Sequence, residues 1–139
     1  MDKIEDRAVD IAKAYEKKHK RTVVDFQRGK KGFRGFDLLS FSKDRKDVRS
    51  IEVKGTQINN TGNIHIPILF DTGFTRNKKL VATHLYVAVF KNGRKADFVK
   101  LLVFTASEIK PEYVNEERHF RIRMPRHIIA EKMASKITE

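Results

Sequence analysis

Two acidic residues and one lysine on neighbouring strand-like segments have the types and spacing that metal-assisted hydrolysis requires. Glu52 and Lys54 lie two residues apart in the segment IEVKG. Because side chains alternate faces along a strand, both point to one side of the sheet, whereas Ile51 and Val53 point to the other. A hairpin between this segment and the preceding one brings Asp37 beside Glu52. We therefore expect two carboxylates and one ammonium group to converge on one face.

These three side chains match the needs of a magnesium-dependent phosphodiesterase. Mg²⁺ prefers oxygen ligands and commonly uses one or two protein carboxylates, together with water and substrate phosphate. Asp37 and Glu52 are the expected ligands, the carbonyl of Val53 is a third oxygen, and Mn²⁺ is expected to substitute. The ion would polarise a phosphodiester and acidify a bound water, while Lys54 assists water attack or neutralises charge on the phosphate. Taken alone, however, an E-x-K motif favours an ordinary surface ion pair.

The segments before the motif predict a helix followed by a strand. Apolar residues recur at helical spacing over residues 2–18, which predicts an amphipathic helix. Asp2 can cap this helix, and Glu5, three residues on, can complete a capping box. Residues 21–27 are β-branched and aromatic, as strands are, and residues 28–35 form a basic loop rich in glycine.

The motif itself lies on a predicted hairpin. The runs FDLLSFS and RSIEVKGTQ, residues 36–42 and 49–57, are separated by a short polar connector of the kind that joins antiparallel strands. Residues 63–70 predict a further strand, which Pro67 pushes toward a sheet edge because it cannot donate a ladder hydrogen bond. A short helix with a basic face is expected over residues 72–80.

The last third of the chain predicts a buried hairpin and a closing helix. Residues 84–90 are almost wholly apolar, as in a strand buried on both faces, and residues 96–104 follow across an Asn-Gly turn. A T-x-x-E capping box starts a brief helix at Thr105, HFRIRM alternates like a half-exposed strand, and Pro125 starts a last helix. This order predicts one α/β domain over residues 1–139, with a mixed central sheet flanked by helices: an αβββαβ core plus a C-terminal hairpin and helix.

The run GFDLLSFS followed by RSIEVKGT resembles the PD-(D/E)xK nuclease superfamily, which has the restriction-endonuclease-like fold. Within it, the chain is most similar to the nuclease-like domain at the C-terminus of the plant protein NO VEIN, over roughly residues 4–104. The resemblance implies a metal ion at Asp37 and Glu52, with Lys54 as the third motif residue. It also implies that Glu5, on the first helix, points into the site.

Three positions near the motif have alternative explanations. Phe36 stands where the superfamily name has proline, a common departure that leaves the aspartate in register. The capping role of Glu5 is as well supported as its role in the site, and both can hold. Gln57 resembles the polar residue that some relatives place near substrate, although an exposed strand end explains it equally well.

The strongly basic composition favours a nucleic-acid partner, with DNA expected first. The chain has 30 Lys and Arg against 18 Asp and Glu, a formal net charge of +12, which attracts polyanions. For any single cation, a solvated surface position is the simpler interpretation. The residues expected to contact nucleic acid are Arg28, Lys30, Lys31, Arg34, Gln57, Arg76, Lys78 and Lys79.

Several other classes of protein lack support. The chain has no cysteine, which excludes disulfides, thiolate metal sites and cysteine nucleophiles. The five histidines show no zinc-site spacing, and no phosphate-binding loop or dinucleotide motif is present. No apolar run approaches the roughly 20 residues needed to span a membrane, and the first residues lack a secretory signal. We expect an intracellular, cytoplasmic protein without membrane association.

Two alternatives to a DNA endonuclease stay open. One is a non-cleaving nucleic-acid-binding or targeting module that retains the nuclease fold, although the intact Asp, Glu and Lys set argues against it. The other is a small RNA-binding protein, which is favoured by charge alone. A symmetric homodimer would suit the cutting of two strands, yet the sequence has no heptad or other assembly signal.

Overall fold

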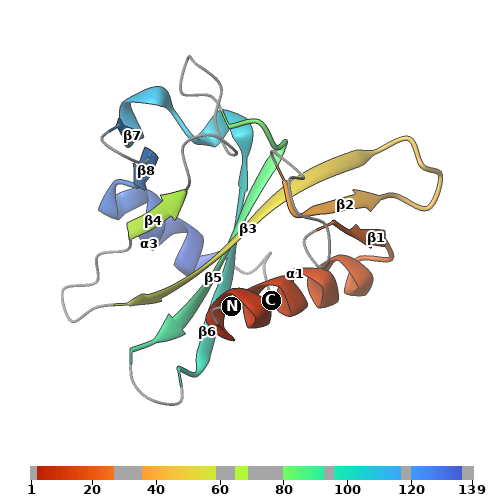
Figure 1. Cartoon of the computed structure of the whole chain (residues 1–139), viewed down its shortest axis with the longest axis horizontal. Coiled ribbons are helices and arrows are strands. Elements are labelled where there is room, and N and C mark those ends of the chain that lie inside the picture. Colours follow the sequence, from red (N-terminus) through yellow and green to blue (C-terminus); the bar gives the residue numbers. More distant parts are fainter. Residues whose placement is uncertain are drawn as a thin grey trace.

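Two sheets packed with helices make up the part of the chain that the computed structural model describes, namely residues 3–26, 36–58, 65–68, 80–92, 96–116 and 120–135 (Figure 1). The elements in chain order are α1 (Lys3–Lys18), β1 (Thr22–Asp25), β2 (Leu38–Phe41), β3 (Val48–Ile58), β4 (His65–Ile68), β5 (His84–Lys91), β6 (Phe98–Thr105), the 3₁₀ turns η1 (Ala106–Glu108) and η2 (Pro111–Tyr113), β7 (Val114–Glu116), β8 (Phe120–Arg123) and α3 (Arg126–Ala134).

The main sheet is mixed and has the strand order β1-β2-β3-β5-β6. Strands β3 and β5 pair in parallel, and the other neighbours pair antiparallel. The expected hairpin of β2 with β3 and the buried strand β5 are therefore confirmed. A second sheet has the order β4-β8-β7, so the strand that contains Pro67 lies at an edge, as predicted. The separate sheet and strand β7 were not predicted from the sequence.

Helix α1 covers one face of the main sheet because its apolar stripe matches the inward residues of β3 and β5. Ala8, Val9 and Ala12 are fully buried against residues of these strands, among them Val53 and Tyr86. The expected helix over residues 2–18 is confirmed from Lys3 onward. Neither described helix is long and apolar enough to cross a membrane.

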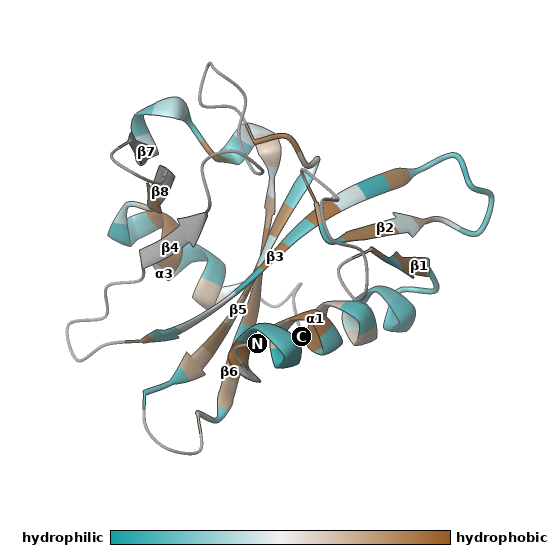
Figure 2. Ribbon diagram, in the orientation of Figure 1, coloured by the Kyte–Doolittle hydropathy of each residue, from teal (hydrophilic) through white to brown (hydrophobic). Residues whose placement is uncertain are grey.

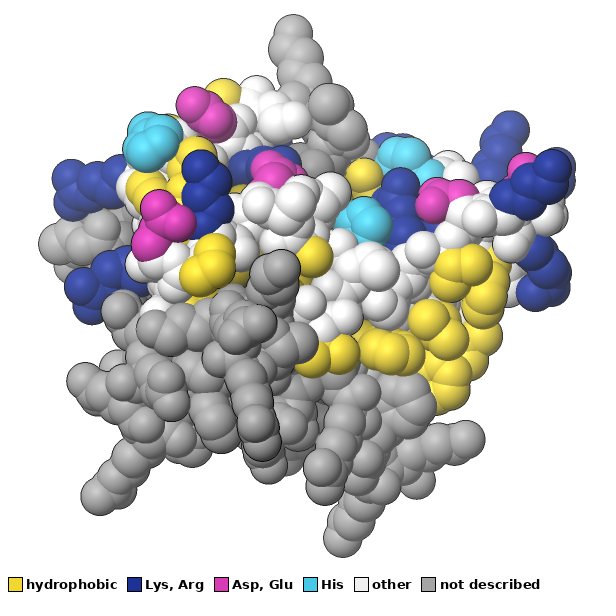
Figure 3. Space-filling view, turned by 90° about the horizontal axis from the view of Figure 1, so that it is seen from above, with side chains coloured by type: hydrophobic (Ala, Val, Ile, Leu, Met, Phe, Trp, Pro, Cys, Tyr) yellow, Lys and Arg dark blue, Asp and Glu magenta, His cyan; other side chains and the backbone are white. Residues whose placement is uncertain are grey.

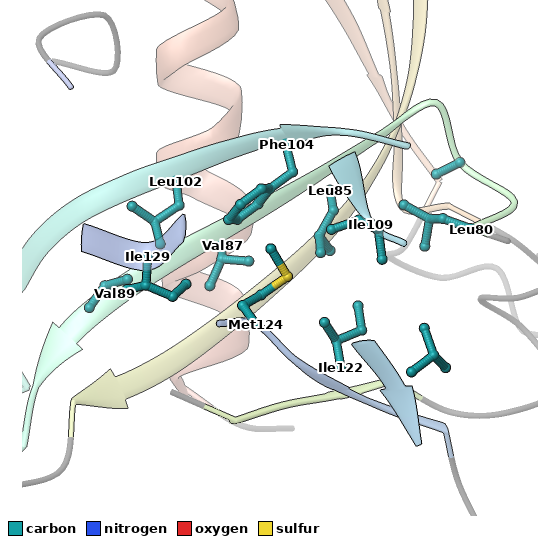
Figure 4. Close-up of a cluster of buried hydrophobic side chains, with 12 residues drawn as sticks. Leu80, Leu85, Val87, Val89, Leu102, Phe104, Ile109, Ile122, Met124 and Ile129 are labelled. Carbon is teal, nitrogen blue, oxygen red and sulfur yellow. The ribbon is translucent and has the colours of Figure 1, made fainter. Parts of the chain in front are cut away.

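The opposite face of β5 packs against the second sheet and α3. Alternate residues of β5, such as Leu85 and Val87, point into this second cluster, which also contains Ile122 and Ile129 (Figure 4). Burial on both faces explains why β5 is almost wholly apolar. Figure 2 shows β5 and β6 largely in the brown of hydrophobic residues, whereas the loop between β2 and β3 is teal.

Two predicted features lie partly outside the described residues. Of the helix expected over residues 72–80, only the last residue is described. The predicted turn consists of Asn92 and Gly93, of which Gly93 lies outside the described residues, although the β5–β6 hairpin that it joins is confirmed. The capping box of Thr105 is confirmed, but it starts a single 3₁₀ turn. The closing helix follows Pro125, also as predicted.

Candidate active site

Asp37 is positioned by the edge of strand β3, just where β2 begins. Its backbone N–H donates to the carbonyl of Ile51 over 2.8 Å, and its carbonyl accepts the N–H of Phe26 over 2.9 Å. Its side-chain Oδ2 accepts the N–H of Val53 over 2.8 Å. Because β2 stops pairing with β3 at Ile51, the Asp37 carboxylate takes the place of the next ladder acceptor.

Glu52 and Lys54 point to the sheet face opposite α1, as strand alternation predicts. Their neighbours Ile51 and Val53 are fully buried against the helix. The Glu52 side chain is 11% exposed, the Lys54 side chain is 20% exposed, and Nζ of Lys54 lies 3.8 Å from Oε1 of Glu52. The pair is therefore nearly enclosed, yet it retains contact with solvent.

Glu5 reaches the same edge of β3 from the first turn of α1. The N–H of Gly55 donates to Glu5 Oε1 over 3.2 Å. The backbone groups of Val53 and Gly55 point to the same side of the strand, so the Val53 carbonyl faces the edge between the carboxylates of Asp37 and Glu5. The structure thus brings together Asp37, Glu52, Lys54 and Glu5, as the sequence predicted.

The electrostatics of this cluster disfavour full ionisation. Burial, together with the charges of Asp37 and Glu5, raises the pKa of the Glu52 carboxyl to about 8, although Lys54 acts in the opposite direction. Burial also raises the pKa of Asp37 above its usual range, against the lowering effects of the Val53 N–H and the Lys54 ammonium. One ammonium group therefore does not balance the carboxylates that face it.

The donor set fits a magnesium ion held by few protein ligands. Two carboxylates and one backbone carbonyl lie at this edge, and Mg²⁺ commonly takes its remaining ligands from water and substrate phosphate. A denser site is not present in the described part of the chain, where no group of three or more His, Asp or Glu side chains is arranged to hold a metal ion. The unbalanced negative charge is what a bound cation would relieve.

Gln57 was also expected near the substrate, and it is not part of this cluster. Gln57 lies on the α1 side of β3, because it is an odd number of residues from Glu52, and its side-chain Nε2 donates to the carbonyl of Lys91 over 3.4 Å. Of its two interpretations, the strand-end position agrees with this placement. The remaining expected nucleic-acid contacts lie outside the described residues: Arg28, Lys30, Lys31, Arg34, Arg76, Lys78 and Lys79.

Two acidic groups near the site were missed in the sequence analysis. Asp25, at the end of β1, lies close enough to Asp37 for its charge to raise the Asp37 pKa, and it forms an ion pair with Lys13 of α1. Glu16 is fully buried on the α1 face within a network of tyrosine and arginine side chains. The sequence contains a signal for each of them: Asp25 ends an apolar strand, and Glu16 lies within the apolar stripe of a helix.

Comparison with known proteins places the segment that carries the cluster within a family match. The family model described as "Protein NO VEIN, C-terminal" matches residues 4–67, a segment that contains all four clustered residues. This match confirms the resemblance stated from the motif and supports a domain of that family over the matched segment. A search of curated proteins found no match.

A solved structure supports the fold over the whole length. It is described as a bacterial homing endonuclease, I-Ssp6803I, and it superposes with a TM-score of 0.56 at 16% sequence identity. The alignment covers 98% of this chain and 97% of that chain. At this identity the likeness shows the fold alone, which confirms a mixed α/β architecture similar to that of the homing endonuclease.

Proposed function

We propose that this protein is a metal-dependent endonuclease that hydrolyses phosphodiester bonds in DNA. The observation that carries the proposal is the convergence of Asp37, Glu52 and Lys54 on one face of the sheet, where burial and the acidic neighbours raise the pKa of the Glu52 carboxyl. A single structural ion pair would have no use for the second and third carboxylates. The basic composition supports a polyanionic substrate.

Each residue has a distinct part in the proposed reaction. Asp37 and Glu52 would hold Mg²⁺ together with the Val53 carbonyl, and the ion, when bound, supplies Lewis-acid polarisation of the phosphate and acidification of water. The Val53 N–H fixes the Asp37 carboxylate in place. Lys54 orients the attacking water or stabilises negative charge that develops on the phosphate. Glu5 fixes the edge of β3 beside Gly55.

The direct test is cleavage of supercoiled plasmid DNA by the purified chain. We expect nicking with Mg²⁺ or Mn²⁺ and none with EDTA. Glu52→Gln and Lys54→Ala should each lower the rate by roughly 100-fold or more, because each removes a group that acts on the reacting phosphate or its ion.

Matched controls separate loss of chemistry from loss of charge. Glu131→Gln and Lys110→Ala change the same residue types at exposed positions elsewhere, and both should leave the rate within about twofold, as surface substitutions usually do. Nicking that persists in both Glu52→Gln and Lys54→Ala would exclude this mechanism. Salt-sensitive binding without nicking in any divalent metal would favour the non-cleaving binding module instead.

A further inference from the structure

The connector between β2 and β3 is a rigid turn that carries three cations. Lys43, Arg45 and Lys46 are exposed within its six residues, Ser42 to Asp47. In Figure 1 this hairpin projects beyond the rest of the sheet at the right of the view, and Figure 3 shows Lys and Arg side chains gathered at the same end.

Side-chain hydrogen bonds fix the conformation of this turn. Ser42 Oγ donates to Asp44 Oδ1 over 2.6 Å, and the N–H of Lys46 donates to the same oxygen over 3.0 Å. The N–H of Asp47 donates to Ser42 Oγ over 3.0 Å. These bonds lower the pKa of Asp44, so this carboxylate remains ionised and committed to the turn.

Arg45 occupies a backbone conformation that an arginine rarely adopts. Its φ is 59°, in the left-handed region where glycine is preferred. The turn therefore carries an arginine where a glycine would be less strained. Lys20 and Ala96 also have positive φ angles, but Arg45 is the one of the three that lies among the cations of this exposed tip, and strained conformations are enriched at functional positions.

The Arg45 guanidinium lies over the sheet face that carries the proposed active site. Its central carbon is 5.6 Å from the centre of the Phe41 ring. Leu38 packs under α1, so alternation along β2 turns Phe41 to the opposite face, which is the face of Asp37 and Glu52. The cation and the carboxylate cluster thus share one side of the sheet.

The base of the hairpin is tied to the body of the protein by Arg21. Its Nε and Nη2 donate to Ser40 Oγ and Ser40 O over 2.8 and 3.2 Å, and its Nη1 donates to Asp47 Oδ2 over 2.8 Å. Since one side chain donates through three nitrogens to residues on both sides of the hairpin base, the tip is held at a fixed place relative to the site.

We propose that the β2–β3 tip is a second nucleic-acid contact, which binds the phosphate backbone of duplex flanking the scissile phosphate. Lys46 lies six positions before Glu52, a distance of roughly 20 Å along extended chain, which corresponds to about six base pairs of duplex. This inference rests on the proposed function, because it takes the carboxylate cluster as the place of cleavage. A rigid duplex lying over this face reaches both places at once.

The test compares two triple variants with equal loss of charge. K43Q/R45Q/K46Q removes the cations of the tip, whereas K17Q/K18Q/K110Q removes exposed cations from the end of α1 and from a distant loop. Binding of a fluorescein-labelled 24-base-pair DNA is measured by anisotropy in EDTA over a salt series. We expect the tip variant to bind about tenfold or more weakly and its log–log salt slope to fall by about two to three. The control variant should lose less than about threefold in duplex affinity, because it weakens only the general electrostatic attraction between the chain and DNA.

A single variant keeps the test independent of folding. Arg45→Gly relieves the left-handed strain, so its melting temperature should be no lower than that of the wild type, and yet its duplex binding should weaken. A 24-nucleotide single strand can bend toward cations on any side, so both triple variants should weaken its binding to a similar extent.

Equal duplex affinities for the tip variant and its control would overturn the inference. Because the binding is measured without divalent metal, this result does not depend on cleavage. If the wild type nicks plasmid but the tip variant binds duplex as well as its control does, only the tip proposal is refuted. If the tip variant binds duplex much more weakly but the wild type does not nick plasmid, only the proposed function is refuted.

Discussion

Two buried carboxylates lie on opposite faces of the main sheet, and they differ in how their charge is balanced. Glu16, on the α1 side, is fully buried, accepts a hydrogen bond from the Tyr86 hydroxyl over 2.8 Å, and faces Arg21 and Arg49 at 3.4 and 3.8 Å. Glu52, on the other side, faces one lysine at 3.8 Å and further carboxylates.

The charge of Glu16 is balanced by other groups of the protein, as in a structural network. The charge around Glu52 is not balanced in this way, as in a site that binds a cation. Around Glu16, two guanidinium groups and a hydroxyl face one carboxylate, so its charge is balanced within the protein even though its Oε1 accepts no hydrogen bond. Around Glu52, the acidic groups of Asp37 and Glu5 outnumber the single ammonium of Lys54. Burial, together with these acidic charges, raises the Glu52 pKa to about 8. A buried region with excess negative charge is costly unless a cation enters it.

The largest effect on stability is expected at Glu16. Glu16→Gln leaves the arginines facing a neutral amide inside the protein, and breaking a buried pair in this way commonly costs about 3 kcal/mol or more. The free energy of unfolding, measured by urea denaturation, should fall by that amount.

Glu131→Gln is the control for this substitution, because Glu131 is exposed on α3. It should change the free energy of unfolding by less than about 0.5 kcal/mol. A neutral result at Glu16 would mean that its network is not the structural balance described above.

The second effect is a pH dependence that arises at Glu52. Its carboxyl keeps a proton up to about pH 8 in the folded chain, against an ordinary pKa of 4.5. Between these values the folded state binds more protons than the unfolded state, so the free energy of unfolding falls as pH rises. Without metal, we expect a loss of roughly 1–3 kcal/mol from pH 5 to pH 8.5.

Glu52→Gln removes this titration and should flatten the profile, leaving a variant that is more stable than the wild type at pH 8.5. Mg²⁺ or Mn²⁺ should raise the wild-type melting temperature at pH 8.5 more than at pH 5, because binding to the folded state requires the ionised carboxylates. A wild-type profile identical to that of Glu52→Gln would contradict the unbalanced charge.

Much of this site could be predicted from the sequence because it depends on local periodicity. Alternation along β3 places Glu52 and Lys54 on one face, and the short connector to β2 brings Asp37 alongside. The mixed α/β fold could be predicted as well, because the order of the helix and the strands can be read from the same local patterns. These features need no knowledge of distant contacts.

The Glu16 network could not be predicted, because it joins parts of the chain that are far apart. Glu16 meets Tyr86 across 70 residues of sequence, and the meeting depends on the parallel pairing of β3 with β5. The position of Glu16 on the apolar stripe of α1, four residues after Ala12, indicates that it faces the sheet, but it does not reveal which side chains it meets there. The separate β4-β8-β7 sheet was missed for the same reason, since strand partners are set by tertiary packing.

Helix α1 approaches strand β3 closely at Gly55, and a methyl group added at this position tests whether that close approach is required. A Cβ atom at this position would lie 2.5 Å from Ile4 Cγ2 and 3.0 Å from the Ile4 carbonyl oxygen. Because the carbonyl is backbone, the start of α1 has to shift. Gly55→Ala should therefore cost roughly 1–3 kcal/mol of the free energy of unfolding.

The same shift moves Glu5 away from the Gly55 N–H at the proposed active site. Plasmid nicking by Gly55→Ala should therefore decline at a temperature where the variant is still folded, as judged by circular dichroism. Full nicking activity in a destabilised Gly55→Ala protein would show that the position of Glu5 does not matter for the site.

The smallest effect is expected at Tyr86, whose hydroxyl joins the two charges of the Glu16 network. It donates to Glu16 and accepts from Arg49 Nη1 over 2.9 Å, and burial beside Glu16 raises its pKa well above the usual range. Tyr86→Phe keeps the ring and both charges, so it removes only these hydrogen bonds, at a cost of about 1 kcal/mol. Urea denaturation should show this loss while the nicking rate stays within about twofold, because the hydroxyl lies on the α1 face. A loss of nicking larger than the loss of stability explains would mean that the two faces of the sheet are coupled, and that the balanced network also positions the carboxylates opposite it.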